Sequence, residues 1–488
     1  MNDLTGYLIL VVVLAIPIVA NILYKRDAGR RLGGRLKSHF RPIDLQTLLV
    51  SERKFPHRVR VDLQRAVDQI IGSTASASFV CGVPISVYQE ISTSDLMSSR
   101  LRPEPLRYED INIGEEEPVR CLRTGLWLLL DGAVKYSVLL VPTYRCGDAE
   151  GIKIEVAAPK TQATQLANDF FTRLESAVRA AASYRGKILS LDEAQSYLGQ
   201  SCGILVHRLR SVAREQVILP KTTVDLLDRN VIQFAQQRSR LTQFRQAVKK
   251  GLLFYGPPGT GKTHTIHYLM SALEGHTTLL ITAEQVKYLS DYMTLARLLQ
   301  PCMVVIEDVD LIGQNRTDMD SPGQQVLLNK LLNEMDGLKE DAEIMFILTT
   351  NRPETLEAAL ASRPGRIDQA IEFPLPDEEG RAKLIRLYSE GLNLSEEVIG
   401  AVVQRTGNVS AAFIKELMRR SVQFYLERNG SGEIQIEDAA SALDEMLFSG
   451  GSLNLKLLGA ANADGTTNGN GQFFRSAQGE GGRQPTAR

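Results

Sequence analysis

The sequence predicts an α/β fold built around a loop that binds nucleotide phosphates. An apolar run at 252–255 leads into a glycine-rich loop at 256–263, and a second apolar run at 302–306 ends directly in Glu307 and Asp308. A third run at 344–348 ends in a polar segment that includes Asn351. Short apolar runs bounded by turn signals are typical of buried strands. The pattern therefore predicts a central sheet that carries phosphate-binding, acidic and amide groups at its strand ends.

The loop fits G-x-x-x-x-G-K-[ST], with Gly256, Gly261, Lys262 and Thr263 in the fixed places. The glycines let backbone N–H groups close around phosphates, Lys262 can reach the β- and γ-phosphates, and the Thr263 hydroxyl can ligate Mg²⁺. A helical pattern at 263–273 follows, so the loop lies between a strand and a helix, as the motif requires. This context excludes a plain glycine turn.

The remaining residues of the expected nucleotide-binding segment are Pro257, Pro258, Gly259, Thr260 and His264. The helix that begins near Lys262 directs the positive end of its dipole at the same anion.

The acid pair Glu307 and Asp308 has the chemistry to hold Mg²⁺ through water and to activate an attacking water. An apolar run followed by acids is usually only a strand entering a loop. Its position downstream of a complete phosphate loop favours a catalytic role, with both acids and Thr263 as metal-site candidates.

Composition limits the other function classes. The chain has 488 residues, and this length indicates two to four domains. Its hydrophobic content is 43%. Its formal net charge of −1 argues against nucleic-acid binding through bulk charge. The five cysteines form no C-x-x-C motif, so neither a disulfide framework nor a zinc site is expected. The cysteines are Cys81, Cys121, Cys146, Cys202 and Cys302. We expect them to act as small buried side chains.

Residues 1–24 are expected to form a transmembrane anchor. The apolar stretch 7–24 would span about 27 Å as a helix, close to a bilayer core of about 30 Å, and basic residues crowd the following segment, 25–40. This segment is predicted to be a basic juxtamembrane linker, which places the bulk of the chain in the cytoplasm. A cleaved signal peptide and a buried core helix are the alternatives, and the acidic start at 1–6 disfavours the first.

Residues 41–205 are expected to form a separate mixed α+β domain. Apolar runs flank Asp131-Gly132, a strong hairpin signal, and residues 152–156 alternate like a half-buried strand. An amphipathic helix is predicted from apolar residues every four positions, namely Leu166, Phe170, Leu174 and Val178. The acidic patch 109–117 is most often a solvated loop. No catalytic constellation is recognisable in this domain.

Several motifs in correct order resemble the AAA family of ATPases. They lie at 256–263, 307–308, 331–338, 350–353, 362–368, 374–380 and 406–412. The resemblance covers roughly 218–447 and implies a Rossmann-like P-loop core with a helical lid, usually built into a homohexameric ring. The implied boundaries are 206–375 for the large subdomain and 376–448 for the lid. The Gly-, Asn- and Ser-rich segment 449–488 is expected to be a disordered tail.

The resemblance also implies roles for individual residues. Asn351 falls at the family's γ-phosphate sensor, and Arg363 and Arg366 fall at arginine fingers that reach a neighbouring subunit's ATP. The alternative for these arginines is a surface ion pair. Gly407 and Ser410 match the lid turn near the adenine.

Two features depart from the family pattern. The order Glu307 then Asp308 inverts the usual acid pair and resembles the mitochondrial AAA ATPase that translocates a folded Rieske protein, and some bacterial relatives. The usual aromatic pore loop is not recognisable, and Tyr288 or Tyr292-Met293 are either stand-ins or core residues. No H-E-x-x-H motif occurs, so a resemblance to membrane-anchored AAA metalloproteases stops at the ATPase.

Together these features predict a membrane-tethered, Mg²⁺-dependent ATPase that remodels or moves protein partners, with ATP and Mg²⁺ as cofactors and no nucleic-acid partner. Three alternatives stay open: a nucleotide-gated membrane scaffold with little turnover, a DNA-directed motor, and a translocator of folded cargo.

Overall fold

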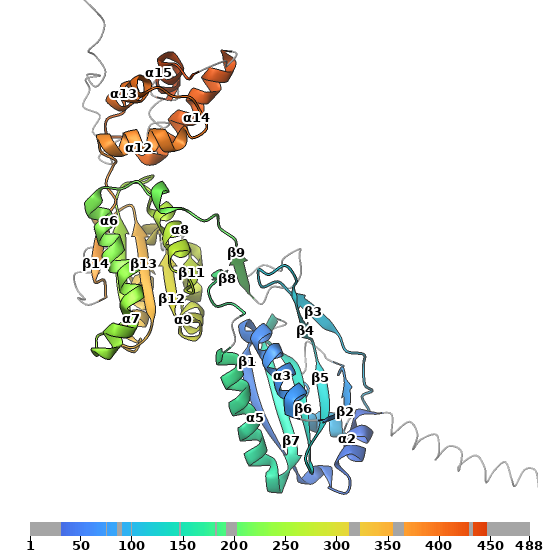
Figure 1. The fold of residues 1–488 in the computed structure, drawn as a ribbon. Coiled ribbons are helices and arrows are strands. Elements are labelled where there is room, and N and C mark those ends of the chain that lie inside the picture. The colour runs from blue at the N-terminus through green and yellow to red at the C-terminus, as the bar shows by residue number, and fades with distance from the viewer. Residues whose placement is uncertain are drawn as a thin grey trace, which may run out of the picture. The chain divides into compact units, whose positions relative to one another are not determined.

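The computed structural model places the chain in two compact units, Met1–Arg208 and Leu209–Arg488 (Figure 1). The described residues are 31–74, 76–84, 90–98, 100–145, 148–180, 183–191, 203–311, 323–354, 366–428 and 433–446. The expected membrane segment at 7–24 and the expected tail at 449–488 lie outside them. Within the described ranges no helix is both long and apolar enough to cross a membrane.

The first unit is a mixed α+β fold. Its strands are β1 Leu48–Pro56, β2 Ser76–Cys81, β3 Tyr108–Ile111, β4 Val119–Leu122, β5 Gly125–Asp131, β6 Val134–Arg145, β7 Asp148–Pro159, β8 Ile188–Leu191 and β9 Ile204–His207. Its helices are α2 Leu32–Phe40, α3 Arg60–Thr74, α4 Thr93–Ser98 and α5 Lys160–Ala180. The main sheet has the order β1-β7-β6-β5-β2 with antiparallel neighbours. The hairpin predicted at Asp131-Gly132 joins β5 to β6.

The segment expected as a linker contributes to this unit's core. Residues 32–40 form α2, and the side chains of Leu32, Leu36 and Phe40 are fully buried. They pack with apolar residues of α4, β5 and β6. The linker prediction is therefore wrong for residues 32–40, because an apolar stripe at helical spacing outweighs the basic residues between its members.

The acidic segment 109–117 also differs from a plain solvated loop. Glu109 lies on β3, which pairs with β4, and its carboxylate is 2.6 Å from the buried guanidinium of Arg60 and 3.5 Å from that of Arg123. One end of the patch therefore balances buried positive charge.

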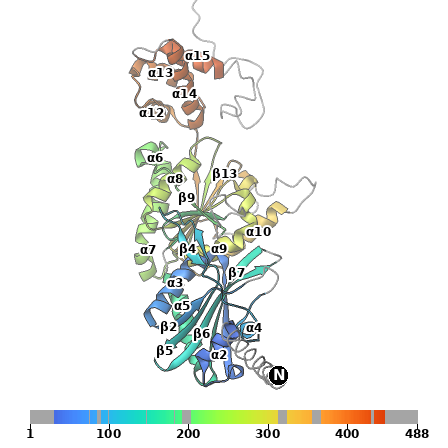
Figure 2. The same cartoon turned by 90° about the vertical axis from the view of Figure 1, so that its right-hand side faces the viewer.

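Helices cover both faces of the main sheet, with α3 and α5 on one side and α4 on the other (Figure 2). On the α4 side the register places Lys54 of β1 opposite Lys153 of β7. Like charges directly opposite each other destabilise a sheet. Acidic groups from elsewhere in the unit must therefore compensate them.

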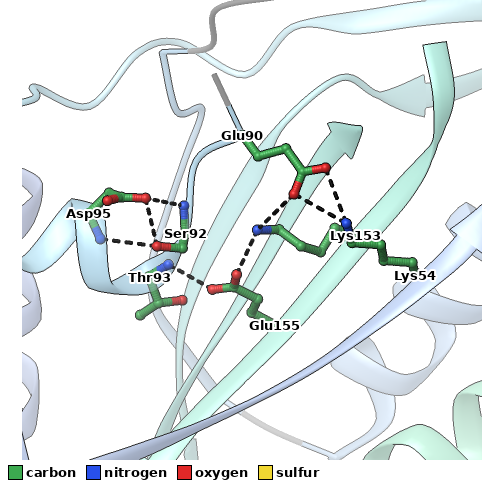
Figure 3. Close-up of polar contacts among 7 residues, drawn as sticks. All are labelled: Lys54, Glu90, Ser92, Thr93, Asp95, Lys153 and Glu155. Atoms are coloured by element: carbon green, nitrogen blue, oxygen red, sulfur yellow. Dashed lines mark hydrogen bonds and ion pairs between the residues drawn. The ribbon is translucent and has the colours of Figure 1, made fainter. Parts of the chain in front are cut away.

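Two glutamates supply this compensation (Figure 3). Glu155 Oε1 is 2.8 Å from Lys153 Nζ, and its other oxygen accepts the backbone N–H of Thr93 at 2.7 Å, at the start of α4. Glu90 lies 3.2 Å from Lys54 Nζ and 4.0 Å from Lys153 Nζ. Lys153 and Glu155 are 4% and 1% exposed, so this strand, predicted as half-buried, is covered on both faces.

We predict that Glu155→Ala destabilises the first unit by about 3 to 5 kcal/mol, because it leaves the Lys153 ammonium buried without its closest counter-charge. Urea unfolding can be followed by the fluorescence of Trp127, the chain's single tryptophan, which is buried on β5. The control is Glu52→Ala, which removes the exposed residue opposite Glu155 and should change stability by about 0.5 kcal/mol or less. Equal effects of the two variants would contradict a buried ion pair that stabilises the unit.

The second unit combines a parallel sheet with a helical subdomain. Its strands are β10 Lys250–Tyr255, β11 Thr277–Ile281, β12 Cys302–Ile306, β13 Ile344–Thr350 and β14 Gln369–Glu372. The helices beside the sheet are α6 Lys221–Leu227, α7 Phe234–Gln243, α8 Lys262–Ala272, α9 Leu289–Leu298 and α10 Gly323–Asp336. The helical subdomain contains α12 Glu378–Tyr388, α13 Glu396–Arg405, α14 Ala411–Glu427 and α15 Ile436–Asp444.

The sheet of this unit runs β14-β10-β13-β12-β11 with parallel neighbours. Figure 2 shows α7 and α8 on one side of it and α10 on the other. Strands β12 and β13 are buried along their whole length, as expected for parallel strands with helices on both faces. The helical subdomain has a separate apolar core formed by α12 to α15.

Candidate functional site

The phosphate loop joins β10 to α8, and its backbone requires glycine. Gly256, Gly259 and Gly261 have φ values of 145°, 76° and 99°, where other residues are strained. A Cβ on Gly256 would also lie 2.2 Å from the carbonyl oxygen of Phe373. Gly261 is the N-cap of α8, so the loop ends at free helical N–H groups that suit an anion.

Lys262, the first residue of α8, carries its ammonium inside this loop. Nζ donates to the carbonyl oxygens of Gly256 and Pro257 at 2.7 and 2.9 Å. Burial lowers the pKa of Lys262 to about 8, while Asp308 and Asp310 oppose this shift. The lysine therefore carries a positive charge at neutral pH, and its partners are neutral carbonyl groups that phosphate oxygens can replace.

Thr263 lies beside the first acid of the pair. Its hydroxyl donates to Glu307 Oε1 at 3.0 Å. A hydroxyl and a carboxylate are hard oxygen ligands of the kind that Mg²⁺ prefers, with further positions filled by water and phosphate. Among the described residues, no group of three or more histidine, cysteine, aspartate or glutamate side chains could hold a metal ion. Thr263 and Glu307 are therefore considered as ligands together with a nucleotide phosphate.

Asp308 has a different environment. Its φ is 48°, in the left-handed region that a non-glycine residue seldom adopts. Its backbone N–H donates to Thr349 Oγ1 at 2.9 Å, and Asn351 Nδ2 donates to its carboxylate at 3.2 Å. Burial, and then the charge of Asp310, raise the pKa of Asp308. The two acids therefore face different partners, Glu307 toward Thr263 and Asp308 toward Asn351.

The helical lid contacts the loop at Gly259. The backbone N–H of Ala412 donates to the Gly259 carbonyl at 3.1 Å. Ser410 is fully buried and caps α14 by accepting the N–H of Phe413 at 3.2 Å. A Cβ on Gly259 would lie 2.9 Å from Ser410 Oγ. Gly407 lies in the turn that precedes this contact, so the structure brings the predicted lid turn to the phosphate loop.

A cleft of about 380 Å³ contains the loop, Asp308 and Asn351, a size suited to a small organic ligand. Its further walls are the segment 216–219 and the lid residues Leu384, Tyr388 and Lys415, which the motifs did not predict, together with Ala411 and Ala412 of the predicted motif at 406–412. His264, predicted in the binding segment, hydrogen-bonds through Nε2 to the carbonyl of Gln216 at 3.1 Å. Leu384 and Tyr388 lie on α12 and Lys415 lies on α14, and no sequence motif marks these three residues.

The structure describes one of the two predicted arginine fingers. Arg363 lies outside the described residues. The Arg366 guanidinium pairs with Asp336 of the same chain, donates to Asn333 Oδ1 at 3.4 Å, and is 9% exposed. Arg366 is therefore engaged within its own chain in this structure.

Two of the suggested pore-loop stand-ins are core residues. Tyr292 and Met293 on α9 are fully buried, and the Tyr292 hydroxyl donates to Gln285 Oε1 at 3.1 Å. Neither side chain can grip another chain from this position.

A larger cavity, of about 510 Å³, lies in the first unit between α5 and the β5–β6 hairpin. Its lining includes Asp131, Leu166 and Phe170, which the sequence predicted for the hairpin and the amphipathic helix, but none of the predicted catalytic or nucleotide-binding residues. The second unit therefore holds the candidate site.

The fold and site define a nucleotide-binding module of the P-loop class. Residues 252–375 match the model of the ATPase family associated with various cellular activities (AAA). Residues 252–375 are therefore similar to the ATPase module of that family, and this match and the relatives below bear out the predicted ATPase class.

The relatives include the ATP-dependent zinc metalloprotease FtsH of Thermus thermophilus, which is 30% identical over 236 residues covering 45% of this chain and 37% of that protein. The proteasome-activating nucleotidase 1 of Halobacterium salinarum is 28% identical over 340 residues, which cover 64% and 80% of the two chains. The proteasome-activating nucleotidase of Methanocaldococcus jannaschii is 32% identical over 226 residues, which cover 44% and 49%. The chain thus spans well under half the length of the metalloprotease.

Proposed function

We propose that the chain hydrolyses ATP with Mg²⁺ and couples hydrolysis to the remodelling or movement of protein partners. The observation that carries this proposal is the separation of the acid pair: Glu307 bonds to Thr263, and Asp308 to Asn351. The relatives' printed names, a metalloprotease and two proteasome-activating nucleotidases, support protein partners over nucleic acid.

In this mechanism Lys262 and the loop N–H groups bind the phosphates. Thr263 and Glu307 would hold Mg²⁺, which supplies charge neutralisation on the phosphate oxygens. Asp308 accepts a proton from the attacking water, and Asn351 orients that water or the terminal phosphate. The raised pKa of Asp308 makes its carboxylate a stronger base than an exposed aspartate.

The two acids should therefore respond differently to isosteric substitution. Asp308→Asn should bind ATP but hydrolyse it about 10² to 10⁴ times more slowly, because general-base assistance is lost. Glu307→Gln should chiefly raise the Mg²⁺ concentration needed for half-maximal turnover. Single-turnover rates and Mg²⁺ titrations of both variants measure these effects. A raised Mg²⁺ requirement in Asp308→Asn, with normal metal dependence in Glu307→Gln, would reverse the two roles. Absence of hydrolysis by the wild-type chain would sink the proposal.

The chain is proposed to act as a homohexameric ring in which Arg363 reaches the ATP of a neighbour. Arg366 is paired with Asp336 in its own chain, so the action between subunits is assigned first to Arg363. Arginine fingers contribute about 10³ to 10⁵ in rate.

Mixing Arg363→Ala with Lys262→Ala chains should restore part of the ATPase activity that each lacks alone, since each supplies what the other is missing. The matched control replaces the first partner by a chain with both substitutions, and this mixture should stay inactive. A turnover per chain that is independent of protein concentration, without restoration on mixing, would exclude a finger that acts between subunits.

Residues 1–24 are proposed to anchor the chain in a membrane with the ATPase module on the cytoplasmic side. Full-length protein should stay with membranes during carbonate extraction, whereas a chain that lacks 1–24 should be released and retain its ATPase activity. Release of the full-length protein by carbonate would refute the anchor.

A further inference from the structure

Thr349, Thr350 and Asn351, at the end of β13, form hydrogen bonds with residues that follow β12. The two strands pair in parallel from Cys302↔Ile344 to Ile306↔Leu348, so their carboxyl ends lie side by side. Beyond this pairing, Thr349 Oγ1 accepts the N–H of Asp308, and the Asn351 amide donates to the Asp308 carboxylate. The remaining contacts of this junction involve Asp310.

Asp310 is 3% exposed and lies in the short helical turn Val309–Leu311. One carboxylate oxygen accepts both the Thr350 hydroxyl at 2.9 Å and the Asn351 backbone N–H at 3.2 Å. The Thr350 hydroxyl in turn accepts the Arg352 N–H at 2.9 Å. A single buried oxygen therefore fixes the backbone on which the Asn351 side chain stands.

The geometry points to Asp310 as a positioning residue for ATP hydrolysis. We propose that its carboxylate, with Thr350, holds the backbone of Asn351 so that the Asn351 amide stays aligned with Asp308. A carboxylate suits this place because it accepts two donors and contributes none of its own. Hydrogen bonds to a charged acceptor are also stronger than those to a neutral one.

The inference deepens the proposed hydrolysis and depends on it. Asp310 bonds to the Thr350 hydroxyl and to the Asn351 backbone, and it acts through Asn351. A small displacement of a catalytic group costs about 10² in rate. Loss of the Asp310 contacts should therefore lower turnover far more than nucleotide affinity.

The first test uses threonine substitutions that keep the charge of Asp310. Thr350→Val removes the hydroxyl that Asp310 accepts and should lower turnover by about 10², with the dissociation constant of a fluorescent ATP analogue within about threefold of wild type. Thr350→Ser keeps the hydroxyl and should recover most of the lost rate.

The matched control is Thr277→Val. Thr277 is a fully buried threonine on β11 of the same sheet, and its hydroxyl donates to the Leu299 carbonyl at 2.9 Å. This variant loses a comparable buried hydrogen bond at a distance from the acid pair. Its thermal stability should fall about as much as that of Thr350→Val, with unchanged turnover.

The second test combines Asp310→Asn with Asn351→Ala. If Asp310 acts through Asn351, Asp310→Asn lowers turnover in the wild-type background and lowers it little further in Asn351→Ala. Equal losses in both backgrounds would overturn the inference, as would Thr350→Val with normal turnover or with affinity reduced as much as rate. A wild-type chain that binds the ATP analogue but does not hydrolyse ATP would instead refute the proposed function. Lys262→Ala is the control for the binding measurement, because this variant should no longer bind the analogue.

Discussion

The parallel register of β10, β13 and β12 is the constraint on which the candidate site depends. Strand β13 lies between the other two and is hydrogen-bonded to both. Because parallel strands end at the same edge of a sheet, the phosphate loop after β10, Asn351 after β13 and the acids after β12 must come together there. The lid contacts the phosphate loop through the hydrogen bond from the Ala412 N–H to the Gly259 carbonyl. The backbone hydrogen bonds between these strands therefore bring residues that are distant in sequence to one site, and side-chain contacts then adjust its geometry.

Opposite charges lie close together at this edge of the sheet. Burial alone disfavours the charged forms of Lys262 and Asp308, since it lowers the first pKa and raises the second. The lysine and the aspartate each favour the other's charged form, and Asp310 adds a second carboxylate close by. Lys262 and Asp310 are buried and Asp308 is half-buried, so electrostatic interactions with a polyphosphate are stronger here than in water.

The parts of this site that the sequence predicted are those set by local chemistry. The phosphate loop requires glycines at fixed spacing, and an acid pair or an amide directly after a buried strand is visible without knowing the fold. The cleft wall from Gln216 to Leu219, and Tyr388 and Lys415 on the lid, come from distant segments that carry no motif. The same limit applies in the first unit, where basic residues predict a linker over α2 and alternation predicts a half-buried strand over 152–156. In both units the misses are tertiary contacts that override composition.

The inverted acid pair illustrates how local and tertiary constraints combine. Glu307 has one methylene more than the aspartate usual at its place in the family, and it reaches the Thr263 hydroxyl. Asp308 is correspondingly shorter than the usual glutamate, and it is the residue whose backbone adopts the left-handed conformation. Such strain costs on the order of 1 to 3 kcal/mol and persists only where the surroundings enforce it. Thr349 and Asn351 enforce it here through two hydrogen bonds. The position of the short carboxylate is therefore set by its own backbone, by Thr349 on β13 and by Asn351 directly after that strand.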